Sequence, residues 1–152
     1  MAFYNANAFV FGEPAFPIAA STTISVGNMV ALSTGYCATA TAATGLKIVG
    51  LAIKGDGNAR GNLNSSGDID NSAGANGAFN VIVESSFPKS GGRRWFWMQN
   101  DAVNACSAAT VGNPVYATGG TTVGTSSSGT SKAGTCYAFD SVNNLVAVVF
   151  DA

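Results

Sequence analysis

GAFNVIVESSFPKSGGRRWFWMQNDAVNACSAATVGNPVYATGGTTV, residues 77–123, holds the patterns from which the fold of this chain can be predicted. Residues 78–84 alternate between apolar and polar side chains, and residues 94–99 form a second, aromatic run. Alternation with a period of two is typical of half-buried strands. The intervening turn contains Pro88 and two glycines, so the two runs are predicted to pair as an antiparallel hairpin.

The second run carries an unusual concentration of aromatic side chains. Trp95 and Trp97 fall on one face of the expected strand, and Phe96 and Met98 fall on the other. We expect the tryptophans to form an aromatic core face. The alternative is an exposed pair that stacks on sugars or anchors an interface.

A short motif, Val-Gly-Asn-x-Val, occurs at residues 26–30 and again at residues 111–115, and a glycine-containing turn follows each copy. Two copies are too few for a solenoid. The repeat therefore predicts two similar corners within one small all-β domain.

The other short apolar runs are separated by glycine-rich turns, which is typical of a barrel or sandwich. Gly50 lies in the middle of one run and predicts a bulge or a close backbone approach. Residues 101–109 are the best helix candidate, a short one at most, and could equally be a loop. The further expected strands are residues 28–33, 36–39, 47–53, 114–117, 121–124, 134–140 and 145–150.

The composition agrees with an all-β fold. Only 10% of the 152 residues are charged, against roughly 25% in an average soluble domain. Thr, Ser, Asn and Gly fill the polar positions, as suits strands and turns. The net charge of −1 leaves no basic surplus for nucleic acid, and a sparsely charged surface favours association.

Residues 1–23 are predicted to be an extended arm, because their aromatic residues follow no regular period and two prolines interrupt them. The arm either places its aromatic side chains in the core of its own domain or reaches onto a neighbouring subunit. Residues 24–152 are then a single β domain. The aromatic residues of the arm are Phe3, Tyr4, Phe9, Phe11 and Phe16.

Residues 54–77 are rich in Gly and Asn and are predicted to be a long irregular loop. Asp56, Asp68 and Asp70 lie in it, but they lack the spacing and the closing Glu of a calcium loop. No metal site is predicted.

The sequence offers few of the side chains that catalysis commonly uses. There is no histidine, and the carboxylates Glu84, Asp101 and Asp140 have nothing in the sequence that brings them together. We therefore predict that the chain is not an enzyme and holds no cofactor.

The cysteines, Cys37, Cys106 and Cys136, are odd in number and show no paired spacing, so free, buried thiols are expected. No export signal is recognisable, and no apolar run approaches the ~20 residues that span a bilayer. The chain is predicted to be made in a reducing cytoplasm and to bind no membrane.

The order of these elements resembles that of the small bacteriophage capsid decoration (cement) proteins. The resemblance covers about residues 24–150 and rests on the order and spacing of several phrases. These are VGNMVAL with its glycine turn, GLKIVGLAI, GANGAFNVIVE, WFWMQNDAV, VGNPVYATGGTTV, SKAGTCYAFD and LVAVVF.

The resemblance implies a small β-barrel or β-sandwich that attaches to the outer surface of a phage head, often as a trimer. The implied partner is the major capsid protein, and a homotrimer is expected, with a dimer left open. The family has no catalytic residues to carry over, and its binding residues differ between shells.

We expect the arm to anchor the protein to the shell or to a sister subunit through Phe3, Tyr4, Phe9 and Phe11. Two other classes stay open. One is a carbohydrate- or receptor-binding module of a phage fibre, with Trp95 and Trp97 as the stacking platform, and the other is a shell-forming subunit.

Overall fold

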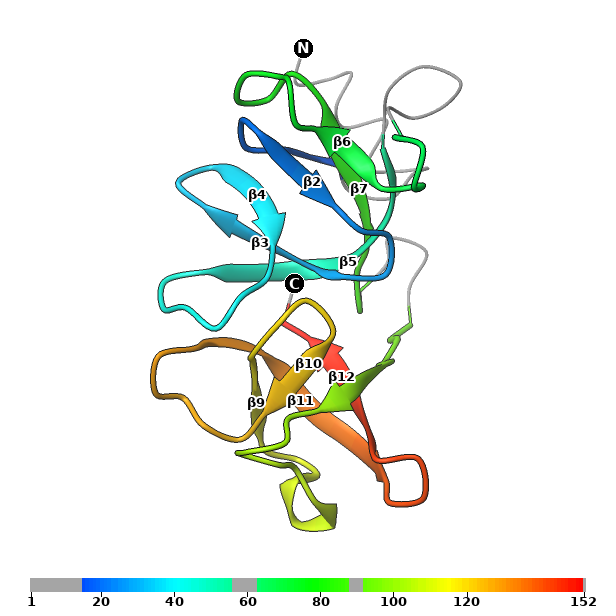
Figure 1. Cartoon of the computed structure of the whole chain (residues 1–152). Coiled ribbons are helices and arrows are strands. Elements are labelled where there is room, and N and C mark those ends of the chain that lie inside the picture. Colours follow the sequence, from blue (N-terminus) through cyan, green and yellow to red (C-terminus); the bar gives the residue numbers. More distant parts are fainter. Residues whose placement is uncertain (1–14, 56–62, 88–91, 152) are drawn as a thin grey trace.

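The computed structural model describes residues 15–55, 63–87 and 92–151, in which every regular element is a β-strand except one three-residue 3-10 turn (Figure 1). The all-β prediction is confirmed. The elements are β1 Ala15–Pro17, β2 Thr22–Ile24, β3 Met29–Ser33, β4 Tyr36–Thr39, β5 Lys47–Gly55, β6 Ile69–Asn71, β7 Asn80–Glu84, β8 Phe96–Asn100, η1 Ala108–Thr110, β9 Pro114–Ala117, β10 Thr122–Gly124, β11 Ser131–Asp140 and β12 Leu145–Phe150.

The strands from β8 onward form a closed five-stranded barrel, called here the C-terminal barrel (residues 92–151). Its strands pair in the order β10-β8-β12-β11-β9, and β9 returns to β10. All pairs are antiparallel except β8 with β10, which is parallel. Apolar side chains that point inward fill it, including Met98, Val115, Val123, Val146 and Val148.

The earlier strands repeat the same arrangement, and we call them the N-terminal unit (residues 15–55 and 63–87). The sheet runs β1-β7-β5-β3-β4. Its two edges meet at a parallel bridge between Ile18 and Cys37, the counterpart of the parallel pairing of Asn100 with Val123 in the C-terminal barrel. Strands β2 and β6 pair antiparallel as a separate two-stranded sheet of this unit.

The two Val-Gly-Asn-x-Val motifs form the same corner in both units. In the first, the Gly27 amide donates to the carbonyl of Ala52, and the Ala52 amide donates back to the carbonyl of Asn28. Gly112, Cys136 and Asn113 make the same two bonds in the second. Both glycines have positive φ, 92° and 88°, a backbone conformation that favours glycine. The prediction of two similar corners is confirmed.

The two units share a core where they meet. Met29, Ala31 and Ile48, on the outer face of the N-terminal unit, are buried in one cluster with Val115 and Phe150 of the C-terminal barrel. Figure 1 shows the two units stacked, with β5 next to the C-terminal barrel. Burial of these apolar side chains between the units stabilises their packing.

Buried hydrogen bonds also join the two units. The Phe150 amide donates to Ser86 Oγ at 2.7 Å, and both residues are fully buried. Ser131 Oγ donates to the carbonyl of Ala43 at 2.6 Å and accepts from the Leu46 amide at 2.9 Å. Each of these bonds fixes a loop or strand of one unit against the other.

The predicted hairpin between residues 78–84 and 94–99 is wrong. Strand β7 pairs with β1 and β5 in the N-terminal unit, whereas β8 pairs with β10 and β12 in the C-terminal barrel. Alternation showed that both segments are strands, but each finds its partners far away in the sequence.

Two predicted irregular segments contain strands. Residues 15–23, assigned to the arm, include β1 and the start of β2, and β1 pairs with β7 despite Pro17. Within residues 54–77, β6 pairs with β2, and Ile69 is fully buried. Ile69 is an isolated apolar residue among polar ones, so periodicity did not reveal it.

Of the two alternatives for residues 101–109, the loop is confirmed and the helix is wrong, apart from η1 at the end of the segment. The Asp101 carboxylate accepts from the amides of Val103 and Asn104. Asp favours turns in this way because its side chain competes with helical backbone bonding.

Candidate binding surface

Three large aromatic side chains lie half exposed on the outside of the C-terminal barrel. Trp95, Trp97 and Tyr137 have relative exposures of 46%, 48% and 52%. Trp95 and Tyr137 stack, with ring centroids 4.7 Å apart and an interplanar angle of 17°. We call these three side chains the aromatic surface.

The alternation of β8 explains why the tryptophans face outward. Phe96 and Met98 are the side chains that contact the barrel core. Trp97 therefore points outward, opposite Ala147 of β12 in the register. The prediction of an aromatic core face is wrong, because both faces of this strand are apolar and alternation alone does not tell which one is buried.

Tyr137 reaches the aromatic surface through an irregularity in β11. The pairing of β11 with β12 shifts between Cys136 and Ala138, so Tyr137 lies at a bulge. Bulges redirect a side chain and are common at functional sites. No local pattern indicates the role of this position, because the stacking partner Trp95 is 42 residues away in the chain.

The internal repeat provides a comparison for these positions. Trp97 pairs with Ala147 of β12, and Ala15 pairs with Ile82 of β7. Because β12 and β7 occupy equivalent places in the two units, Trp97 corresponds to Ala15. Tyr137 corresponds in the same way to Ile53, at the bulge between β5 and β7. The same strand arrangement is thus built with smaller side chains at these two places, so the fold itself does not require the aromatic ones.

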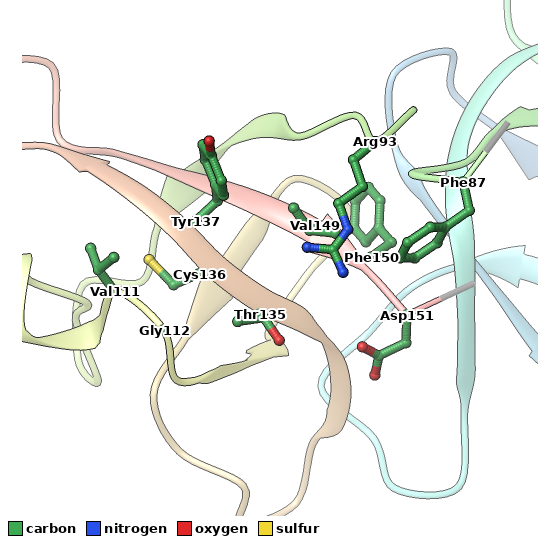
Figure 2. A pocket seen from close by; sticks show the side chains of 10 residues that line it. All are labelled: Phe87, Arg93, Val111, Gly112, Thr135, Cys136, Tyr137, Val149, Phe150 and Asp151. Atoms are coloured by element: carbon green, nitrogen blue, oxygen red, sulfur yellow. The ribbon is translucent and has the colours of Figure 1, made fainter. Parts of the chain in front are cut away.

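A pocket of about 440 Å³ opens beside the aromatic surface (Figure 2). Its lining combines apolar walls with a few polar groups, as ligand pockets of this size do. The Arg93 guanidinium lies 5.5 Å from the centre of the Phe87 ring, a cation–π contact. The lining residues are Phe87, Arg93, Val111, Gly112, Thr135, Cys136, Tyr137, Val149, Phe150 and Asp151.

The carboxylates considered for catalysis each have a structural partner. Glu84 forms an ion pair with Arg94, and Asp101 accepts from turn amides. Hydrogen bonds from Asn143, first from its side chain and then from its amide, lower the pKa of Asp140. These contacts tie each carboxylate to a turn or to a neighbouring segment.

The expected state of the cysteines is confirmed, since all three are free and buried. Burial raises the pKa of Cys37 to about 12 and that of Cys106 to about 11. A thiol with a raised pKa stays protonated and is a poor nucleophile or metal ligand. Among the described residues, no group of three or more His, Cys, Asp or Glu side chains could hold a metal ion.

The arm residues predicted to bind, Phe3, Tyr4, Phe9 and Phe11, lie outside the described residues. The aromatic surface comes from β8, β11 and the segment before β8. Sequence reasoning named Trp95 and Trp97 as an alternative platform, but it missed Phe87, Arg93 and Tyr137.

Comparison of the chain with family models, curated proteins and solved structures found no match. Within residues 15–55, 63–87 and 92–151, no helix is long and apolar enough to cross a membrane.

Proposed function

We propose that this chain is a capsid decoration protein, which binds the outer surface of a phage head and stabilises the shell by bridging major capsid subunits. The observation that carries the proposal is the exposed aromatic surface on a sparsely charged β-barrel. Trp, Tyr and Arg are the residues most enriched at the energetic centres of protein interfaces. The resemblance in the order of the elements supports the same class.

The mechanism of cementing is additive. Each contact that buries apolar surface contributes roughly 25 cal/mol per Å². A homotrimer, or a dimer, would present several aromatic surfaces at once to the regular lattice of the virion exterior. Linked contacts then bind far more tightly than single ones, provided that their spacing matches the lattice.

Heads assembled without the protein provide the test. Purified protein is mixed with such heads, and co-sedimentation and the thermal stability of the heads are measured. We expect the wild type to bind and to stabilise the heads, and Trp97→Ala to lose at least about tenfold in affinity, as the loss of an interface hot spot does.

The matched control is Val103→Ala, at an apolar side chain that is 86% exposed and lies outside the aromatic surface. This variant should bind as the wild type does. Failure of the wild-type protein to bind heads, or equal binding by the Trp97 and Val103 variants, would count against the proposal.

The exposure of the tryptophans also favours a second candidate, a carbohydrate-binding module of a phage fibre. Exposed Trp faces stack on sugar rings. A glycan array probed with the wild type and with Trp97→Ala tests this function. Specific glycan binding by the wild type that Trp97→Ala abolishes, without head binding, would favour the fibre module.

A further inference from the structure

Another pocket, of about 360 Å³, lies on the N-terminal unit, where the β3–β4 hairpin meets the segment before β5 and the turns beside β1 and β7. We call it the hairpin pocket. Its volume is at the lower end of the range of ligand pockets, which suits a small ligand. Figure 1 shows β3 and β4 in the upper unit and β11 in the lower one, so the hairpin pocket is separate from the aromatic surface.

The described residues that line the hairpin pocket carry no charge. Its apolar side chains include Ala31 and Ala38, which pair across the hairpin. Sites that recognise a carboxylate or a phosphate use charged donors, Arg above all. The lining therefore indicates a neutral ligand with several hydrogen-bonding groups. The uncharged polar residues of the lining are Ser33, Thr34, Tyr36, Thr39, Thr41 and Asn76.

Several of these polar groups are available to a ligand. Within the described part of the chain, no protein atom forms a hydrogen bond with the side-chain hydroxyls of Tyr36, Thr39 or Thr41. The Asn76 Oδ1 atom accepts from the Ala20 amide at 2.7 Å, which orients the Asn76 side chain and leaves its NH₂ group as a donor. Hydroxyl groups both donate and accept, so together with the Asn76 amide they can match the hydroxyls of a sugar.

The internal repeat shows that the fold does not require this hollow. Ala31 pairs with Ile48, and Tyr116 has the same place opposite Lys132 in the C-terminal barrel. Ala38 corresponds to Gly124 in the same way, because each pairs across its hairpin with the equivalent residue. The N-terminal unit thus has a methyl group where the C-terminal barrel has a tyrosine ring, and the space over the hairpin stays open.

The turn at the rim of the hairpin pocket is strained. Thr34 and Gly35 connect the two strands with φ values of 53° and 90°, as in a type I′ turn, in which Asn-Gly is favoured. A β-branched residue at positive φ is an outlier. Such strain persists most often where a residue has a role in binding, and Thr34 is one of the lining residues.

We propose that the hairpin pocket binds a neutral saccharide, as a single sugar ring. The apolar face of the ring would lie against Tyr36 and the two alanines, and its hydroxyls would exchange hydrogen bonds with Thr39, Thr41 and Asn76. This site goes beyond the proposed function and does not depend on head binding. It also differs from the fibre module, in which Trp97 carries the sugar.

Titration of the full-length, ¹⁵N-labelled chain with methyl glycosides of glucose, galactose, mannose and N-acetylglucosamine tests the proposal. At least one of them should shift the amide resonances of Ser33, Tyr36 and Thr41. Tyr36→Phe removes one hydroxyl and should weaken the affinity about fivefold. The matched control, Tyr116→Phe, removes a hydroxyl outside the hairpin pocket and should bind as the wild type does.

Two further variants sharpen the test. Ala38→Leu fills the hollow and should abolish binding, and the dispersion of its spectrum reports whether it folds. Trp97→Ala should bind as the wild type does.

Four outcomes would overturn the proposal. They are no shift in the hairpin pocket with any of the four glycosides, shifts centred instead on Trp95, Trp97 and Tyr137, equal affinities of the two Tyr→Phe variants, and tighter binding of the anionic methyl glucuronide than of any neutral glycoside.

Discussion

Gly50 and Gly134 occupy the same place in the two halves of the molecule. Gly50 pairs with Val30 of β3, and Gly134 pairs with Val115 of β9, in both cases beside a shift of register. A Cβ on Gly50 would collide with the carbonyl oxygen of Glu84, and one on Gly134 would collide with that of Val149. The predicted close backbone approach at Gly50 is confirmed, and the repeat extends it to Gly134.

Substitution of either glycine should therefore be strongly destabilising. We expect Gly50→Ala and Gly134→Ala each to lower the free energy of unfolding by about 3 kcal/mol or more, because backbone has to move. Gly50 has the additional strain of a φ of 143°. Denaturant unfolding measures the loss, and Gly119→Ala, which would meet only atoms at ordinary contact distance, should be nearly neutral. A stable Gly134→Ala protein would contradict this account of the barrel.

The buried hydrogen bond of Ser86 should matter to the junction between the two units. Ser86→Ala leaves the Phe150 amide without its partner in a fully buried place, which costs about 1–3 kcal/mol. Ser128→Ala, at an exposed turn residue, should change the unfolding free energy by less than about 0.5 kcal/mol. Equal stability of the two variants would show that Ser86 does not join the units.

Trp97 should be dispensable for folding, because nearly half of its surface is exposed. We expect Trp97→Ala to unfold with a midpoint close to that of the wild type, at a cost of about 1 kcal/mol, which is typical of a point substitution. Met98→Ala removes the neighbouring inward side chain and should cost about 2–5 kcal/mol. Thermal unfolding compares the two variants, and the reverse order would contradict the assignment of the faces.

Stability should fall at alkaline pH through Cys37. Burial raises the pKa of its thiol from 9.0 to about 12, so the folded protein holds the proton more tightly than the unfolded chain does. The stabilising contribution is complete below pH 9 and is lost as the pH rises toward 12. Unfolding free energies measured across this range under reducing conditions should fall less steeply in Cys37→Ala. Identical slopes would exclude Cys37 as the cause.

Removal of residues 1–12 should leave the β fold intact, because every described strand begins at Ala15 or later. If the segment anchors the protein as the sequence predicts, the truncated protein should lose binding to heads, since Phe3, Tyr4, Phe9 and Phe11 go with the segment. Circular dichroism and co-sedimentation measure the two properties separately. Unchanged head binding by a folded, truncated protein would refute the anchoring role of the segment.

Local patterns in the sequence predicted most strands and the repeated corner, because alternation and glycine positions depend on neighbouring residues. Leu145–Phe150, for example, is both predicted and observed as β12. Such patterns do not predict which strands pair with each other. The pairings of β7 with β1 and of β8 with β12 join segments far apart in the chain, and nothing local distinguishes them from a hairpin.

The candidate surface was harder to predict than the fold. The orientation of Trp97 depends on which side of β8 the barrel closes, and that is decided by strands that follow later in the sequence. The stacking of Trp95 on Tyr137 depends on a bulge in another strand. Composition indicated a surface suited to association, but only the assembled barrel brings Trp95 and Tyr137 together.

The tandem order of the two units has a consequence for synthesis on the ribosome. All strands of the N-terminal unit lie within residues 15–84, so it can fold before the later strands emerge. Met29, Ala31 and Ile48 would then be exposed to solvent, because the C-terminal barrel that buries them has not yet been translated. A nascent chain paused at this stage exposes an aggregation-prone apolar face. The interval before the second half is made is therefore when this protein is most exposed to misassociation with its neighbours or capture by chaperones.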